Sequence, residues 1–219
     1  MTFKEYIETE KEKLGEMNKS EKIAYFKEYY LKVCIAALVI LALLVWFLID
    51  MGKNMRPTVV TGGVLNVHIT SEGATFLRED YMKSLGKNEK THNIEFASYI
   101  LLDQSEPQSY AIFQAELLSG QYNYLITDKA GMEYIAQMEC AGDMNEILDQ
   151  DLKDRLSSDM AYAKSGENGT NIAAAIDISD TAFSKEYITS NDKAYFVVTG
   201  KIEDDESAIA VLKYILNKQ

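Results

Sequence analysis

The sequence has little proline and little cysteine, and each shortage excludes a class of protein. Its 219 residues include two prolines and two cysteines. Because no residue type dominates and proline is rare, the composition does not predict a low-complexity or disordered chain. Two cysteines cannot form a disulfide framework in a chain of this size. We expect Cys34 and Cys140 to be structural thiols that form no disulfide, on different sides of a membrane boundary.

Positive charge is scarce relative to negative charge. The chain has 22 lysine and arginine residues against 34 aspartate and glutamate residues, and its net charge is -12. Nucleic-acid binding requires clustered basic side chains, and no basic stripe is present, so we expect no nucleic-acid partner. Nearly all of the excess negative charge lies after Pro57. This excess favours solubility and disfavours adhesion of that part to anionic lipid or wall polymers.

Motifs of catalysis and metal binding are missing. The two histidines have no metal-ligand spacing, and there is no H-E-x-x-H, G-x-S-x-G or glycine-rich phosphate loop. The "TGG" of residues 61–63 is expected to precede a strand, whereas a phosphate loop follows one. Asp177, Ser179 and Asp180 could supply oxygen ligands to a cation, but such residues more often form turns and helix caps. We predict no catalytic residue, metal or cofactor and therefore no enzyme.

One long apolar run is present near the N-terminus. The stretch "VCIAALVILALLVWFLI" has 17 residues without a charge, or about 25 Å as a helix. With its flanking residues it predicts a transmembrane helix over residues 31–51. No small-x-small cleavage site follows, so the run is typical of an uncleaved signal anchor and not of a cleaved signal peptide. A single-pass membrane protein is predicted, with the lipid bilayer as its partner through this helix.

The lysine and arginine residues on each side of this helix predict its orientation. Four lysines lie on the N-terminal side between residues 14 and 32, against Lys53 and Arg56 on the other side. The positive-inside rule places the N-terminus in the cytoplasm and the C-terminal domain outside the cell membrane. The predicted divisions are a cytoplasmic helical arm over 1–30, the transmembrane helix, a linker over 52–61 and an extracytoplasmic domain over 62–219.

The arm is rich in helix formers and is expected to break near Gly15 and Asn18. Ser20 is the expected cap of a second helix, which continues into the membrane because nothing after it would stop a helix. An apolar stripe at helical spacing is predicted on this second helix. It would either rest at the lipid surface or dock a partner. Its members are Ile23, Phe26, Tyr29 and Tyr30.

The C-terminal domain alternates apolar runs of strand type with helical patterns. Strands are predicted over 63–69, 94–103, 122–128, 160–165, 171–179 and 194–200. Helices are predicted over 71–86, 107–120, 129–138, 145–156, 181–187 and 204–218. The fourth and fifth strands are separated by the hairpin-like "GENGT". The rhythm predicts an α/β fold with a three-layer, doubly wound, mostly parallel sheet.

Polar side chains follow the first three predicted strands. Open α/β sheets bind ligands at the carboxyl ends of their strands, so these residues are a candidate polar edge. The candidates are Thr70, Ser71, Asp103, Thr127 and Asp128. The same residue types cap helix N-termini, and capping is the alternative role, favoured most clearly for Asp128.

The order of these elements resembles the first lobe of extracellular solute-binding proteins of the type 2 periplasmic-binding fold. The resemblance rests on "FASYILL", on "YNYLITDKAGMEYIAQMECAGDMNEIL" and on "AIDISDTAF" followed by "AYFVVTG" and "DDESAIAVLKYIL". It covers residues 62 to 217 and implies a membrane-anchored protein of clostridial-type bacteria. Such proteins clamp a ligand between two lobes, but here 20 to 30 residues separate the third unit from "NIAAAIDIS", which leaves no room for a second lobe.

Two functions remain open from the sequence. Under the first, the extracytoplasmic domain senses or holds a small solute at the strand ends without catalysis. Under the second, the protein is an accessory subunit of a membrane complex, and another protein docks on its open sheet edge.

Overall fold

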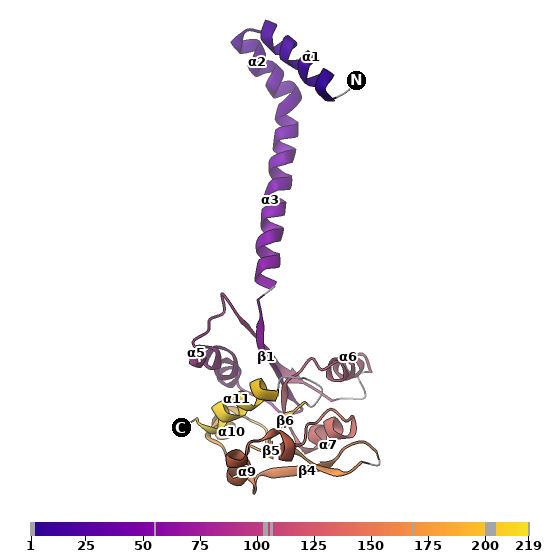
Figure 1. Ribbon diagram of the computed structural model, residues 1–219, viewed down its shortest axis with the longest axis vertical. Coiled ribbons are helices and arrows are strands. Elements are labelled where there is room, and N and C mark those ends of the chain that lie inside the picture. Colours follow the sequence, from indigo (N-terminus) through magenta and orange to yellow (C-terminus); the bar gives the residue numbers. More distant parts are fainter. Residues whose placement is uncertain are drawn as a thin grey trace. The chain divides into compact units, whose positions relative to one another are not determined.

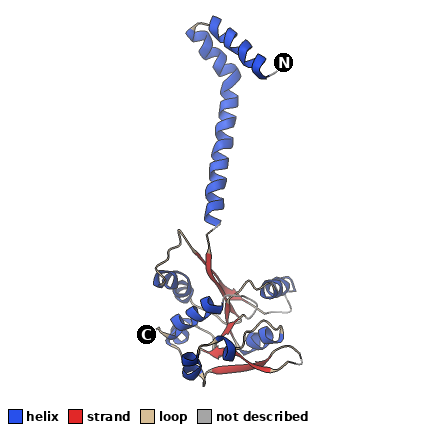
Figure 2. Cartoon of the chain, in the orientation of Figure 1, coloured by secondary structure: helices blue, strands red, loops and turns tan. Residues whose placement is uncertain are grey.

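The computed structural model describes residues 3–54, 56–102, 105, 107–167, 169–199 and 205–218 (Figure 1). The chain divides into two compact units, Met1–Met55 and Arg56–Gln219. Helices make up the first unit, and the second combines helices with strands (Figure 2). Neither of the two cysteines forms a disulfide; Cys34 is exposed and Cys140 is buried.

The first unit contains the apolar helix that the sequence predicted. Its elements are α1 (Phe3–Glu16), α2 (Lys19–Tyr25), the π-helical turn η1 (Phe26–Tyr30) and α3 (Leu31–Asn54). From α2 to the end of α3 the helix is continuous, and its span Lys19–Gly52 is long and apolar enough to cross a membrane. None of its most apolar window is buried within the protein. A helix in a soluble core would bury that surface.

The break between α1 and α2 is capped by Asn18, so the expected cap at Ser20 was wrong. The Asn18 side chain accepts hydrogen bonds from the backbone N–H groups of Ser20 and Glu21, each at 3.0 Å. The Glu21 carboxylate in turn accepts from the Asn18 backbone N–H at 2.8 Å. This reciprocal capping box satisfies two helix donors at once, which Ser20 could not do from inside the first turn.

The arm folds back on itself through one carboxylate. The hydroxyls of Tyr25 and Tyr30 both donate to Glu10 Oε2 of α1, at 2.9 and 2.7 Å. In an α-helix, side chains five residues apart point in different directions, but the wider π turn brings them to the same side. Tyr30 therefore faces α1 while its ring stacks on Phe26 of the predicted apolar stripe, and Ile23, Phe26 and Tyr29 are exposed.

The second unit is built on a six-stranded mixed sheet. Its strands are β1 (Thr58–Leu65), β2 (Asn93–Ile100), β3 (Tyr124–Thr127), β4 (Met160–Lys164), β5 (Asn171–Asp177) and β6 (Tyr195–Val198). Their order in the sheet is β2-β1-β3-β6-β5-β4. β1 pairs in parallel with β2 and β3, and the other three pairings are antiparallel. Following these pairings, β1, β2, β3 and β5 run in one direction, so four of the six strands are parallel in direction.

Helices cover both faces of the sheet and give the predicted three layers (Figure 1). They are α4 (Ser71–Thr75), η2 (Phe76–Asp80), α5 (Tyr81–Ser84), α6 (Pro107–Leu118), α7 (Lys129–Gln137), α8 (Met144–Ile147), α9 (Gln150–Leu156), α10 (Ala182–Tyr187) and α11 (Asp205–Leu216). On one face α6 and α7 bury Leu117 and Ile135 against Leu125. On the other face α10 and α11 bury Phe183 and Leu212 with the sheet residues.

The first strand lies earlier in the chain than the sequence suggested. β1 covers Thr58–Leu65, so residues 52–61 contain the end of α3 and the beginning of this strand instead of a linker throughout. Residues 61–63 lie inside the strand, where Gly62 pairs with Tyr124. A Cβ on Gly62 would collide with the Tyr124 ring. The glycines therefore serve packing and do not form a loop.

One predicted helix is divided in two. The segment 145–156 forms α8 and α9, and Asp149 stands between them as the cap of α9. Its carboxylate accepts a hydrogen bond from the Leu152 backbone N–H at 2.9 Å. A carboxylate that caps a helix start needs an extended backbone, which ends the preceding helix.

Candidate functional site

Thr127 and Asp128 lie where β3 meets α7. Thr127 is fully buried as the last residue of β3. Asp128 caps α7, because its Oδ1 accepts a hydrogen bond from the Gly131 backbone N–H at 2.8 Å. The expected capping role of Asp128 is confirmed.

Asn66 joins the ends of the three parallel strands, and the sequence analysis missed it. It follows β1 with a φ of +61°. Its Nδ2 donates to Asp128 Oδ1 at 3.1 Å, and its Oδ1 accepts from the Leu102 backbone N–H, after β2, at 2.8 Å. Asparagine tolerates the left-handed conformation better than most residues. The sequence pattern placed Asn66 inside the predicted strand 63–69, so only its residue type could have signalled this position.

Thr70 and Ser71 lie at the beginning of α4. Thr70 caps α4, with its Oγ1 accepting from the Gly73 backbone N–H at 3.1 Å. Its own backbone N–H donates to the Tyr187 carbonyl at 2.8 Å. Ser71 is exposed. The fifth candidate, Asp103, lies outside the described residues. Of the other four, Thr70 and Ser71 share the beginning of α4, and Thr127 and Asp128 share the junction of β3 and α7.

A cavity of about 380 Å³ lies beside Thr70 and Ser71. The His68 and Tyr99 rings in its lining stack with centroids 4.7 Å apart and planes 9° apart. Thr75, the exposed Arg78 and Ser98 add to its polar lining. Small-molecule sites combine aromatic surface with polar groups that fix the orientation of the ligand. This lining offers both, and its polar side chains outnumber the apolar Ile69 and Ala74. Thr127 and Asp128 do not line this cavity.

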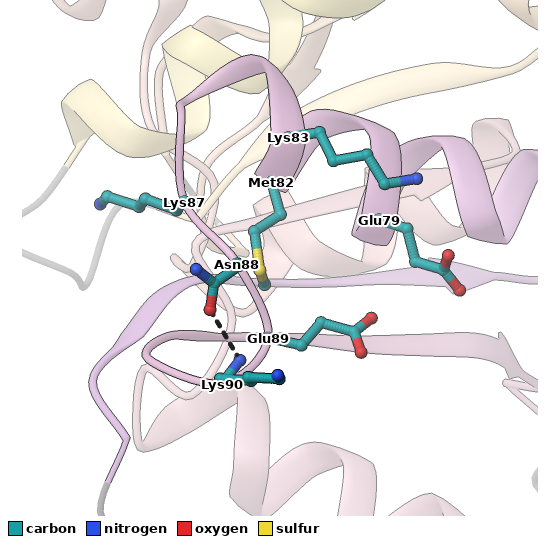
Figure 3. Close-up of a pocket in the computed structure, with 7 residues that line it drawn as sticks. All are labelled: Glu79, Met82, Lys83, Lys87, Asn88, Glu89 and Lys90. Atoms are coloured by element: carbon teal, nitrogen blue, oxygen red, sulfur yellow. Dashed lines mark hydrogen bonds between the residues drawn. The ribbon is translucent and has the colours of Figure 1, made fainter.

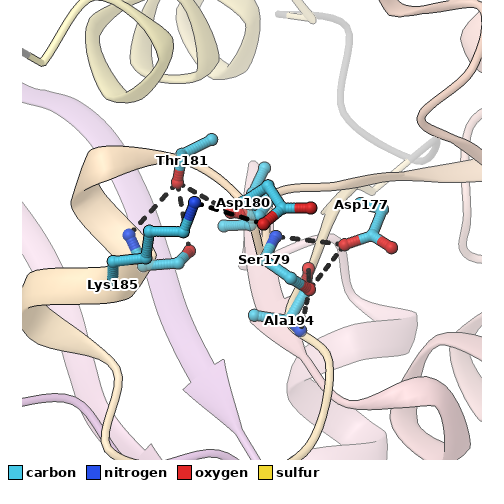
Figure 4. Close-up of polar contacts among 8 residues, drawn as sticks. Asp177, Ser179, Asp180, Thr181, Lys185 and Ala194 are labelled. Carbon is cyan, nitrogen blue, oxygen red and sulfur yellow. Dashed lines mark hydrogen bonds and ion pairs between the residues drawn. The ribbon is translucent and has the colours of Figure 1, made fainter.

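The "DISD" segment forms a turn, as expected (Figure 4). Asp177 accepts from the Ser179 backbone N–H at 3.0 Å and pairs with Lys193 at 2.6 Å. Burial acts to raise the pKa of Asp177, but the hydrogen bonds from Lys193 and Ser179 outweigh it and leave the pKa lowered. Asp180 pairs with Lys185 at 3.2 Å, and Thr181 caps α10. Within the described ranges, no group of three or more His, Cys, Asp or Glu side chains is placed to hold a metal ion.

A larger cavity, about 490 Å³, is lined by none of the candidate residues (Figure 3). It is lined by Glu79, Met82, Lys83, Lys87, Asn88, Glu89 and Lys90. These residues belong to η2, α5 and the segment before β2, so the cavity lies at the amino end of the parallel strands. Ligands of open α/β sheets bind at the opposite, carboxyl end. We therefore place the candidate solute site at the smaller cavity beside Tyr99.

Comparisons of the chain with protein-family models, with curated proteins and with solved structures found no match.

Proposed function

We propose that the chain is a single-pass membrane protein whose α/β domain lies outside the cell and holds or senses a small solute without catalysis. The anchor in this proposal is α3, supported by its length and its exposed apolar surface. The orientation is supported by the four lysines that precede the helix against two basic residues after it.

The cavity beside the stacked His68 and Tyr99 rings carries the solute-binding part of the proposal. It lies at the carboxyl end of β2, the end at which open α/β sheets hold ligands. The strand order 2-1-3 of the parallel half is also the order at the beginning of one class of doubly wound sheets. This order supports a lobe like those of type 2 periplasmic-binding proteins.

Thermal unfolding of the full chain in detergent with a panel of sugars, amino acids and short peptides tests this function. A solute at 100 times its dissociation constant adds about 2.7 kcal/mol to the free energy of unfolding. Tyr99→Ala should remove the response. Tyr162→Ala, which alters a similarly exposed tyrosine on the far edge strand β4, should retain it. Lack of a response to every solute, or an equal loss in both variants, would contradict the proposal.

One observation favours a second function, docking of another protein. β2 is an edge strand, and exposed apolar side chains lie along it and on α6. They are Tyr99, Leu101, Ile112 and Leu118. An exposed sheet edge with apolar side chains is typical of a protein interface. Crosslinking in cells should then recover a heteromeric complex that Ile112→Glu abolishes, and recovery of the monomer alone would exclude this function.

A further inference from the structure

A basic corner stands out from an otherwise acidic domain. Residues 56–219 contain 14 basic and 26 acidic residues, a net charge of -12. Five of these basic residues lie together around the beginning of β2, within the linings of two cavities that share Met82 and Glu89. We define the basic corner as Arg56, Arg78, Lys83, Lys87 and Lys90. Three acidic residues accompany it, Glu79, Asp80 and Glu89, so the local net charge is +2.

The loop that presents Lys87 and Lys90 has a defined backbone. Gly86 adopts a φ of +67° and closes α5 through a hydrogen bond from its N–H to the Lys83 carbonyl at 2.9 Å. The Asn88 side chain accepts from the Lys90 backbone N–H at 3.0 Å. Figure 3 shows that the Lys87 ammonium points away from the Glu79 and Glu89 carboxylates. The Lys87 ammonium is therefore not covered by these two carboxylates, whereas Lys83 pairs with Asp80 at 3.1 Å.

An apolar side chain accompanies this charge. Leu85 is 40% exposed at the same turn. Lysines around an exposed leucine match a lipid surface, where the ammonium groups meet phosphates and the leucine reaches the acyl boundary. A soluble anion would gain nothing from the leucine.

One member of the corner, Arg56, follows α3 closely in the chain. Met55 alone separates Asn54, the last residue of α3, from Arg56. Two residues span at most about 7 Å. Inside the domain, Arg56 donates to the Glu89 carbonyl and is thereby fixed to the corner. Arg56 thus stays near the apolar helix in any orientation of the domain.

We propose that the basic corner binds the phosphate groups of anionic lipids at the surface where α3 leaves the bilayer. This inference rests on the proposed membrane anchor. The net negative charge of the domain predicted little adhesion to anionic lipid. That repulsion acts on the acidic remainder of the domain, so the basic corner is the part that meets the lipid. Binding should weaken with salt, because exposed charges are screened within about 10 Å at 0.1 M.

Acylation of lysines in the full chain tests the proposal. The protein is placed in nanodiscs of phosphatidylcholine, with or without 30% phosphatidylglycerol, and the acylation rate of each lysine is followed by mass spectrometry. Lys87 and Lys90 should react at least threefold more slowly with phosphatidylglycerol, and 0.5 M salt should restore the rate. Lys164, exposed on β4 at the far edge of the sheet, is the internal control and should not change.

Variants sharpen the test. In Lys87→Glu/Lys90→Glu, Lys83 remains as a reporter and should lose its protection, whereas the control Lys164→Glu should keep it. Equal rates in both lipids, equal slowing of Lys164, or equal protection by inorganic phosphate in phosphatidylcholine would each overturn lipid binding. Carbonate extraction reports the anchor separately. An anchored chain with unprotected lysines refutes the corner alone, and a chain released from lipid refutes both proposals.

Discussion

Asp128→Ala should destabilise the second unit, whereas Asp128→Asn should not. The aspartate oxygen accepts hydrogen bonds from the Gly131 backbone N–H and from Asn66 Nδ2. Loss of a helix cap costs about 1 kcal/mol and loss of a further hydrogen bond about another 1 kcal/mol. The alanine variant should therefore lose about 2 kcal/mol. Asparagine keeps an oxygen at the same place and should preserve both bonds.

Thermal unfolding of the full chain in detergent measures the difference. For a domain of this size, 2 kcal/mol corresponds to a fall of about 4–8 °C in the unfolding midpoint. The same pair of variants separates capping from ligand binding at this residue. If Asp128→Asn unfolds like the wild type but no longer responds to a solute that stabilises the wild type, the carboxylate contacts ligand. If Asp128→Ala unfolds at the wild-type midpoint, the account of this junction is wrong.

Three further predictions concern buried or paired groups. Tyr124→Phe removes a buried hydroxyl that has no hydrogen-bond partner among the described residues, so the free energy of unfolding in urea should rise by about 1 kcal/mol or more. Tyr122→Phe loses a 2.6 Å hydrogen bond to a carboxylate and should lower the free energy of unfolding. A lower free energy of unfolding in both variants would refute the argument. Lys193→Met should lower stability between about pH 4 and pH 10, because the pKa of Asp177 is lowered and the pKa of Lys193 is raised. The contribution of this ion pair to stability disappears as pH falls through the lowered pKa of Asp177 or rises through the raised pKa of Lys193. The urea midpoints of the variant and the wild type should therefore converge in acid. A constant difference between the two midpoints down to pH 2 would contradict this prediction. Glu10→Ala should speed amide hydrogen exchange in α1, whereas Glu8→Ala, in the same helix, should not; equal exchange in all three proteins would exclude the link between α1 and α2.

Local patterns predicted the kind and order of the elements well. Each predicted strand of the domain overlaps an observed one, and the caps at Thr70 and Asp128 are where their residue types suggested. These features depend on residues close in sequence, such as a carboxylate three residues from the N–H it accepts. The cap predicted at Ser20 was wrong because a second capping residue lies close by. Asn18 forms a capping box with Glu21 and caps the helix instead.

Strand neighbours were harder to predict than strands. β6 enters the sheet between β3 and β5 and runs antiparallel to both, although its own sequence reads like a parallel strand buried on both faces. Apolar residues indicate burial but not the strand to which a segment pairs. The packing role of Gly62 could not be predicted for the same reason, because its packing partner Tyr124 lies 62 residues later in the chain.

The candidate polar edge was one group in sequence but lies on two elements in the structure, the beginning of α4 and the β3–α7 junction, and Asn66 belongs to the second. Its side chain holds Asp128 on one side and the backbone after β2 on the other. Oδ1 of Asp128 therefore accepts two hydrogen bonds within the fold, and Thr127 has no access to solvent. Thr70 and Ser71 keep access to a cavity, because α4 starts beside β2. A solute at this domain would consequently meet Tyr99 and His68 before it met the β3–α7 junction, and substitutions at Tyr99 are the more direct test of binding.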